Sequence, residues 1–368
     1  MARRLTTIII LSIFGIAVGI VTAASVDRFR SNEALSIAFD RLRLFHNLRQ
    51  AALEDYLRSM ASDVRAASES PRVVEAMEKL DFAWKAYGPD ARKVLPRLYI
   101  DENTARPDER APLLETDDGS DYIQYHHAFH GWAQRFLDHF GYYDAFLINP
   151  RGDIIYSVAK ERDFATSVKT GPYRKSPLAD VFRNAMENPS AAVDFSDFAF
   201  YAPSGGDPAA FAAHAITRGG KVLGVFAVQI PAEPINELMQ FTAGMGATGE
   251  TYLVGQDGRM RSQSRFIETP TLLEVKVDNA SVQDGMAGQS GARIVKDYRG
   301  IAVLSVYAPV NFGGQPWILL AEIDREEAIT MKRPWTAAAV GILAGLLAMG
   351  FASLIWHLVR GPTEASMA

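Results

Sequence analysis

Two stretches of the chain, FLINPRGDII at residues 146–155 and YLVGQDGRMR at residues 252–261, share one design. Each is an apolar strand, a tight turn that ends in glycine, and a second strand. The segments that close the two units also match, because VFAVQI at 225–230 resembles ILLAEI at 318–323. The opening segments are offset by 106 residues and the closing segments by 93, so the second copy is shorter between its landmarks. The sequence therefore predicts a duplicated module.

Each copy continues from its hairpin into a helix and then into three strands. In the first copy the helix begins at Ser176-Pro177, an N-cap followed by proline. The expected strands are 192–201, 210–217 and 221–230 in the first copy, and 292–297, 301–309 and 317–323 in the second. A helical stripe from residue 27 to residue 66 precedes both copies and stops before Ser70-Pro71. The prediction is an α+β chain: two tandem modules with antiparallel sheets, stacked on one long N-terminal helix.

The composition removes several classes of protein. The chain has 368 residues, a formal net charge of −5 and no cysteine. The absence of cysteine excludes disulfide scaffolds, thiolate metal sites and thiol catalysis. No basic excess favours a nucleic acid partner, and no arrangement typical of a nucleophile, a P-loop or a catalytic carboxylate pair is recognisable. We therefore expect neither an enzyme nor a bound cofactor.

Two uncharged apolar runs flank the modules, at 5–26 and at 334–359, and each is long enough to cross a bilayer. Arg3 and Arg4 place the N-terminus in the cytoplasm under the positive-inside rule. The alternative for the first run is a cleaved signal peptide. The expected organisation is a tail at 1–4, a span at 5–26, a stalk helix at 27–70, a membrane-distal module at 71–240, a membrane-proximal module at 241–333, a span at 334–359 and a tail at 360–368.

Several segments resemble the double Cache sensor domain of bacterial transmembrane receptors, in which two PAS-like modules lie between two membrane spans. The segments that carry the resemblance are Phe140–Asp144 with the hairpin after it, Asp163–Thr166, Gly171–Arg174, Asp197–Ser204, Gly246–Val254 and Ala321–Asp324. The resemblance implies extracytoplasmic sensing of a small molecule by the distal module, with signalling through the second span to a chemotaxis, kinase or cyclase output. Only residues 360–368 follow the second span, so the rival hypothesis is a membrane-tethered binding or scaffold protein without its own output.

The resemblance also implies a location and partners. We expect an inner-membrane protein that crosses the membrane twice, with its large domain in the periplasm or outside the cell. A homodimer is expected from the stripe at 27–66 and from the small-residue pairs Gly15/Gly19 and Gly341/Gly345. A cytoplasmic signalling partner would receive the output. Crosslinking at Leu42, Phe45 or Leu53 is the test that this hypothesis suggests.

The ligand is expected between the sheet of the distal module and the segment that crosses it, 163–176. The predicted ligand-binding residues combine aromatic walls with charged groups: Tyr143, Phe164, Tyr173, Arg174, Asp197 and Tyr201. Arg174 would hold a carboxylate and Asp197 an amine, although Tyr173 and Arg174 would equally serve as structural caps of the sheet. His126 and His130 share one helix face and are weak metal candidates, since two ligands do not close a four-ligand site.

Overall fold

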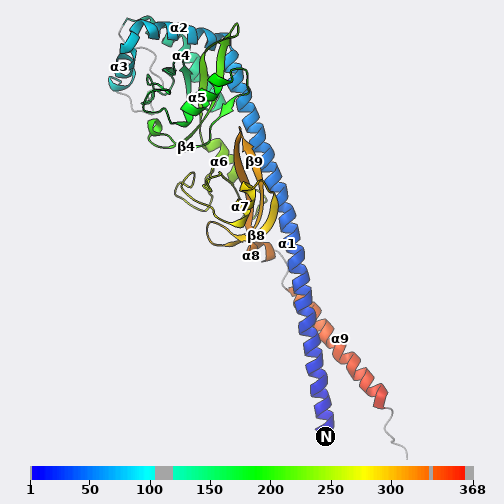
Figure 1. Ribbon diagram of the computed structural model, residues 1–368. Coiled ribbons are helices and arrows are strands. Elements are labelled where there is room, and N and C mark those ends of the chain that lie inside the picture. The colour runs from blue at the N-terminus through cyan, green and yellow to red at the C-terminus, as the bar shows by residue number, and fades with distance from the viewer. Residues whose placement is uncertain (1, 104–118, 331–334, 361–368) are drawn as a thin grey trace, which may run out of the picture.

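A single helix runs along the whole molecule. The computed structural model describes residues 2–103, 119–330 and 335–360, and α1 (Ala2–Glu69) joins the predicted first span and the stalk without a break. The predicted tail at 360–368 lies outside the described residues except for Arg360. The second apolar helix, α9 (Trp335–Arg360), lies beside the N-terminal half of α1 (Figure 1). Both helices are long and apolar enough to cross a membrane.

The chain turns sharply where α1 ends. Ser70 is the N-cap of α2 (Pro71–Tyr87), and its hydroxyl accepts a hydrogen bond from the backbone N–H of Val73 at 3.2 Å. Pro71 occupies the first helical position, where its missing N–H costs nothing. Three further helical segments follow: a 3₁₀ turn at Gly88–Asp90, α3 (Ala91–Pro96) and a π-helical turn at Arg97–Asp101. The helix α4 (Asp121–Phe140) then returns toward α1.

The first sheet lies at the end of α1 that is farther from the apolar helices, and we call it, with its helices, the distal module (Figure 1). Its strands are β1 (Asp144–Ile148), β2 (Ile154–Ser157), β3 (Asp194–Phe195), β4 (Ala199–Phe200), β5 (Pro208–Arg218) and β6 (Lys221–Ile230). Their order is β2-β1-β6-β5-β3, with β4 also paired to β5, and each pairing is antiparallel. The helix α5 (Pro177–Glu187) starts at the N-cap Ser176, as predicted.

The second sheet forms the proximal module, which lies nearer the apolar helices (Figure 1). After α6 (Glu233–Gln240), its strands are β7 (Glu250–Val254), β8 (Gly291–Lys296), β9 (Ala302–Phe312) and β10 (Gln315–Asp324). They pair antiparallel in the order β7-β10-β9-β8. The helix α7 (Ala280–Met286) precedes β8, and α8 (Arg325–Thr330) leads from β10 toward α9.

The predicted α+β architecture of two antiparallel modules on a long helix is confirmed. Two predicted strands are wrong. The strand expected at 192–201 is two short strands, β3 and β4, separated by Ser196, Asp197 and Phe198. In the second hairpin, residues 259–261 form no strand, because Arg259 and Met260 make only isolated bridges to Lys276 and Val254.

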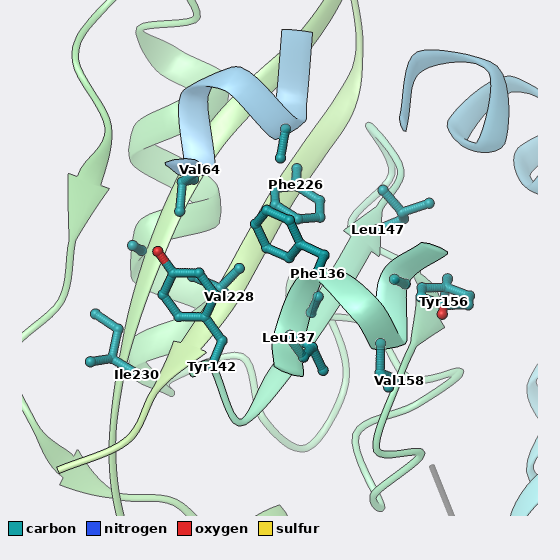
Figure 2. Packing of buried hydrophobic residues seen from close by; sticks show 14 of the residues in the cluster. Val64, Phe136, Leu137, Tyr142, Leu147, Tyr156, Val158, Phe226, Val228 and Ile230 are labelled. Carbon is teal, nitrogen blue, oxygen red and sulfur yellow. The ribbon is translucent and has the colours of Figure 1, made fainter. Parts of the chain in front are cut away.

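Both sheets turn one face toward α1, and a hydrophobic core fills the space between each sheet and this helix. Leu53, Met60 and Val64 of α1 pack with β5 and β6 of the distal sheet. Figure 2 shows this core, in which Val64, Phe136, Tyr142, Phe226 and Val228 converge. Farther along, Leu42 packs with β9 and β10 of the proximal sheet. We call the opposite face of each sheet, which α5 or α7 covers, the outer face.

The glycine pairs of the two apolar helices face each other within one chain. A β-carbon on Gly19 would lie 2.9 Å from the carbonyl oxygen of Gly341, and one on Gly345 would lie 2.8 Å from that of Gly15. Small residues at these positions let the two helix backbones approach closely. The glycines therefore pack α1 against α9. The dimer hypothesis required these glycines to form a free surface for a second copy, and they do not.

Replacing Gly19 by leucine tests this contact. The new side chain has to displace backbone, so we expect overpacking to destabilise the helix pair by about 1–3 kcal/mol. The measurement is the melting temperature of the full chain in lipid nanodiscs. Gly350→Leu in α9 is the matched control, because nothing among the described residues lies within 4 Å of a β-carbon there. Equal melting temperatures for the two variants would contradict the contact.

Candidate functional site

Three of the six predicted ligand-binding residues, Tyr143, Tyr173 and Tyr201, come together around Glu161 and Asp163. The ring of Phe164 instead packs 5.8 Å from that of Tyr99, in the core on the α1 side of the sheet. Phe164 and Tyr201 are buried, and Tyr143 and Tyr173 are partly exposed. The rings of Tyr173 and Tyr201 lie 6.4 Å apart. The hydroxyl of Tyr143 donates to Glu161 at 2.7 Å, and that of Tyr201 donates to Asp163 at 2.5 Å. Tyrosines of the predicted set thus lie beside carboxylates that the prediction did not include.

The two charged residues of the prediction do not join this group. Arg174 is exposed and donates to the carbonyl oxygen of Gly171 at 3.3 Å, as a cap of the local turn. Asp197 lies between β3 and β4, and Arg261 of the proximal module holds it through two hydrogen bonds of 2.8 and 2.9 Å. The predicted pairing of Arg174 with Asp197 around one ligand is therefore wrong.

Asp144 is the first buried acid of the group. It opens β1, and strand alternation places it on the outer face with Phe146 and Ile148. Its Oδ1 accepts hydrogen bonds from the backbone N–H groups of Ala145, Val158 and Ala159. Its Oδ2 is buried and has no hydrogen-bond partner among the residues that the structure describes. One oxygen of this carboxyl group is thus fully used and the other is available.

Two more buried acceptors share this environment. Asp163 uses Oδ2 for Tyr201, while its Oδ1 has no partner within the described part of the chain. Gln229 lies directly opposite Asp144 on β6 and donates to the hydroxyl of Ser204 at 3.1 Å. Its Oε1 is the third buried acceptor without a described partner. Ser204 in turn donates to Glu161 at 2.6 Å, which links the group into one network.

Lys160 is the cation of the group and is fully buried. Its Nζ donates to the carbonyl oxygen of Val158 at 3.3 Å and lies 5.4 Å from the ring centre of Tyr99. Lys160 and Ala165 both have positive φ, 55° and 61°, in the segment that crosses the sheet. A positive φ costs a non-glycine residue conformational energy, and such backbone strain concentrates at functional sites. We call Asp144, Lys160, Glu161, Asp163, Tyr201, Ser204 and Gln229 the distal polar cluster.

The charges of this cluster do not balance, since three acids face one lysine. Burial raises the pKa of Asp163 to about 7. Burial also raises the pKa of Asp144 well above its usual range, and Asp163 adds to this effect. The pKa of Lys160 falls to about 7 because burial outweighs the attraction of Asp144. A site of this kind favours protonation of its acids, or a positively charged group bound from outside.

Sequence reasoning missed most of the cluster because its charges lie in the run 160–163, which is typical of a solvated turn. One signal was available. Asp144 stands directly before the apolar run of the first hairpin, at a position where alternation predicts burial. The strand pairing that places Gln229 opposite Asp144 is a property of the fold and could not be read from either segment alone.

His126 and His130, the weak metal candidates, are core residues. Both are buried on α4, and their rings stack at 4.6 Å. His130 Nδ1 lies 2.7 Å from the hydroxyl of Tyr156. Across the described ranges, no three residues of types His, Cys, Asp or Glu are grouped so that they could hold a metal ion.

Asp197 belongs to a contact between the two modules, which we call the intermodule clasp. Arg261 is buried and binds Asp197 and also Asp257. The indole N–H of Trp317 on β10 donates to Asp197 at 3.0 Å. Trp317 also stacks on Phe312 at 3.9 Å, and this pair packs against Phe198 of the distal module. The segment 194–204 therefore contains the clasp residues Asp197 and Phe198. It also contains two members of the distal polar cluster, Tyr201 and Ser204.

Comparison with known proteins agrees with this architecture. The sequence profile of the double Cache family, described as "Cache domain", matches residues 26–330. Among curated proteins, none matches the chain.

Several solved sensor domains have a similar structure to this chain, at low sequence identity. The ligand-binding domain of the Pseudomonas aeruginosa amino acid chemoreceptor PctB with L-Gln is 14% identical, with a TM-score of 0.44, over 84% of this chain and 98% of that one. The corresponding domain of the Campylobacter jejuni chemoreceptor Tlp3 with 4-methylisoleucine is 14% identical, with a TM-score of 0.47, over 81% and 94%. The sensor domain of the V. cholerae histidine kinase DctB is 12% identical, with a TM-score of 0.45, over 80% and 98%.

Removing the carboxylate of Asp197 tests the clasp. In Asp197→Ala, Arg261 keeps Asp257 and the carbonyl oxygen of Arg259 but loses two hydrogen bonds to a carboxylate, and a buried charge with lost hydrogen bonds destabilises the fold. We expect a loss of about 2 kcal/mol in the free energy of unfolding of the full chain in nanodiscs. Asp180→Ala is the matched control, because its ion pair with Arg183 is exposed on both sides and such pairs contribute about 0–1 kcal/mol. Equal losses in both variants would refute the clasp as a stabilising contact.

Proposed function

The chain belongs to the Cache domain family, and on that premise we propose that it senses a small molecule outside the cytoplasm through the distal polar cluster. The observation that carries the proposal is the imbalance of buried charge at this cluster, three acids against one lysine, with three buried acceptor atoms that have no described partner. We keep the module boundaries at 71–240 and 241–333 as part of the proposal.

The chemistry of the cluster selects for a protonated amine. Asp144 Oδ2, Asp163 Oδ1 and Gln229 Oε1 are all acceptors, and an ammonium group offers three N–H donors. Binding a cation would let both aspartates ionise and would remove the cost of burying them unpaired. The aromatic rings of Tyr143, Tyr173 and Tyr201 would cover the remainder of the molecule. The proposed ligand is therefore a small amine.

The route of the signal follows the segment 194–204. Tyr201 and Ser204 are members of the cluster and donate hydrogen bonds to Asp163 and Glu161. In the same segment, Asp197 binds Arg261 and Trp317 of the proximal module. Trp317 lies on β10, which ends at Asp324 directly before α8. A ligand changes this path only by binding one arrangement of the segment more tightly than another. We propose that the second apolar helix reports this change to a partner in the cytoplasm, with the protein in the inner membrane.

The test is calorimetric titration of the full chain in nanodiscs with primary amines and with analogues that have a hydroxyl in place of the amine. We expect binding of an amine only. Asp163→Asn removes one ionisable partner, and we expect it to weaken binding by at least about 2 kcal/mol, roughly thirtyfold in Kd. Asp138→Asn on the exposed side of α4 is the matched control and leaves binding unchanged.

Two results would refute the amine proposal. One is equal binding of the hydroxyl analogues, and the other is unchanged binding in Asp163→Asn. If no amine binds to a chain that melts cooperatively, the rival function of a tethered scaffold without its own output gains support.

The homodimer needs a surface other than the predicted one. Leu42 and Leu53 are buried against the sheets of the same chain, so they cannot contact a second copy. The opposite side of α1 exposes large apolar side chains at helical spacing: Phe29, Ile37, Leu44 and Leu48. An exposed apolar stripe on a long helix is typical of helix pairing. We propose that two copies associate through this stripe.

Disulfide crosslinking in membranes tests this surface, because the chain has no cysteine of its own. Leu44→Cys and Leu48→Cys are expected to give covalent dimers on oxidation. Leu42→Cys and Leu53→Cys, which are buried, serve as controls and are expected to stay monomeric. The reverse pattern, or monomers throughout, would contradict pairing through the exposed stripe.

A further inference from the structure

The proximal module repeats the buried polar position that opens the distal cluster. The repeat offsets of 106 and 93 residues place Glu250 at the position of Asp144 and Glu322 at the position of Gln229. The strand pairing confirms the equivalence, because Asp144 lies opposite Gln229 and Glu250 lies opposite Glu322. The distal copy thus pairs an acid with an amide, whereas the proximal copy pairs two acids.

Glu322 lies on the outer face of the proximal sheet and is buried there. Alternation along β10 places it with Ile318 and Leu320, which pack under α7. Directly opposite residues on neighbouring strands have β-carbons about 4.5–5.5 Å apart, and like charges at that separation are destabilising. Two ionised carboxylates here would therefore repel each other with little water to screen them.

The hydrogen bonds divide the two acids into different roles. Glu250 accepts from the hydroxyls of Ser264 at 2.8 Å and Tyr298 at 2.6 Å, and from the backbone N–H of Arg265 at 2.9 Å. These donors suit an ionised carboxylate. Glu322 accepts from Tyr252 at 3.0 Å, and its Oε1 has no hydrogen-bond partner among the described residues. Burial raises the pKa of Glu250 too, but its three donors oppose that rise, so Glu250 is the better equipped of the two acids to be ionised.

Ser305 completes this arrangement. It lies directly opposite Glu322 on β9, it is buried, and its hydroxyl also has no partner in the described part of the chain. A protonated Glu322 has an O–H to donate, and the hydroxyl of Ser305 is an acceptor at the neighbouring position. The same hydroxyl donates to an ionised Glu322, which opposes the rise of its pKa, so Ser305 serves Glu322 in either protonation state.

The other charged groups around the pair give Glu322 no cation of its own. From the turn between β8 and β9, Arg299 donates to Asp297 at 2.6 Å and to Asp324 of β10 at 2.7 Å. From the loop after β7, Arg265 donates to the carbonyl oxygen of Gly249 at 2.6 Å. Both guanidinium groups thus have their own acceptors, and Asp297 adds a further negative charge beside Glu322.

We propose that Glu250 and Glu322 form a proton-binding site in the proximal module, with the proton on Glu322 and its loss at higher pH loosening the β7–β10 pair. The site does not depend on the distal ligand, so it adds a second input to the sensor. Burial raises the pKa of Glu322 to about 8, and the neighbouring Asp297 and Glu250 act in the same direction.

The position of the site connects it to the second apolar helix. Glu322 lies just before the end of β10, where α8 begins. Glu327 of α8 accepts hydrogen bonds from the backbone N–H groups of Ala247 and Thr248, at the entry to β7. The backbone N–H of Asp324 donates to the hydroxyl of Thr248 at 3.1 Å. A change in the β7–β10 pair would therefore act on α8, and through it on α9.

The direction of the pH effect follows from the two pKa values. The unfolded chain releases the proton near the ordinary value of 4.5, whereas the folded chain keeps it up to about 8. Between these values the folded state binds more protons, so its stability rises as the pH falls. The contribution of Glu322 to the free energy of unfolding is most favourable near pH 5, falls as the pH rises, and becomes constant above about pH 8.

The test compares the melting temperature of the full chain in nanodiscs from pH 5 to pH 9 with that of Glu322→Gln. The amide keeps the shape of the protonated acid and cannot ionise. We expect the melting temperature of the variant, relative to wild type, to increase steadily with pH up to about 8 and then to level off. Glu268→Gln, at an exposed position in the same module, is the matched control. We expect the difference between its melting temperature and that of the wild type not to change with pH.

A difference between Glu322→Gln and wild type that stays constant with pH would overturn the proposal. If Glu322→Gln does not fold, Tyr252→Phe decides instead. This variant removes the hydroxyl that stabilises ionised Glu322, so the midpoint of the pH effect is expected to move to higher pH. A midpoint that does not move would overturn the proposal as well.

Discussion

The structure depends on the burial of one side of α1 against both sheets. Leu53, Met60 and Val64 serve the distal sheet, and Leu42 serves the proximal sheet. Each large apolar side chain buried in this way contributes about 1.5–3 kcal/mol. Polar contacts add to this, since the ring of His46 lies 3.2 Å from the carbonyl oxygen of Leu319. The same helix continues into the first apolar span, so both modules and the span share one structural element.

One face of each sheet packs against α1, so the buried polar groups of the two sites lie on the outer face. There each module places an acid at the start of its first strand, opposite a polar residue of its last strand. The distal copy adds Glu161, Asp163 and a network of hydroxyl groups, which suit an organic cation. The proximal copy adds a second acid, which suits a proton. The intermodule clasp joins the two modules through Asp197 and Trp317. Duplication of one fold thus supplies two different inputs on a shared helix.

The sequence predicted the duplication, the long helix, the N-caps Ser70 and Ser176 and the aromatic residues near the distal cluster, because all of these are local patterns. It failed where the deciding contact is distant along the chain. Asp197 looked like a ligand group, yet its partner Arg261 belongs to the other module. The burial of Lys160 and Asp163 could not be read from their own segment, because it depends on how that segment crosses the sheet. The glycine pairs looked like a dimer contact because nothing local shows that α9 returns to α1.

The central claim is that both outer faces hold protonated carboxyl groups at neutral pH when no cation is bound. Infrared spectroscopy of the full chain tests it directly, in nanodiscs of ether-linked lipids that have no ester carbonyl to overlap the signal. The account predicts a carbonyl band of protonated carboxyl groups at pH 7 that is strongly reduced in the double variant Asp163→Asn/Glu322→Gln. A wild-type spectrum without that band at pH 7, or a band that the double variant leaves unchanged, would contradict the account.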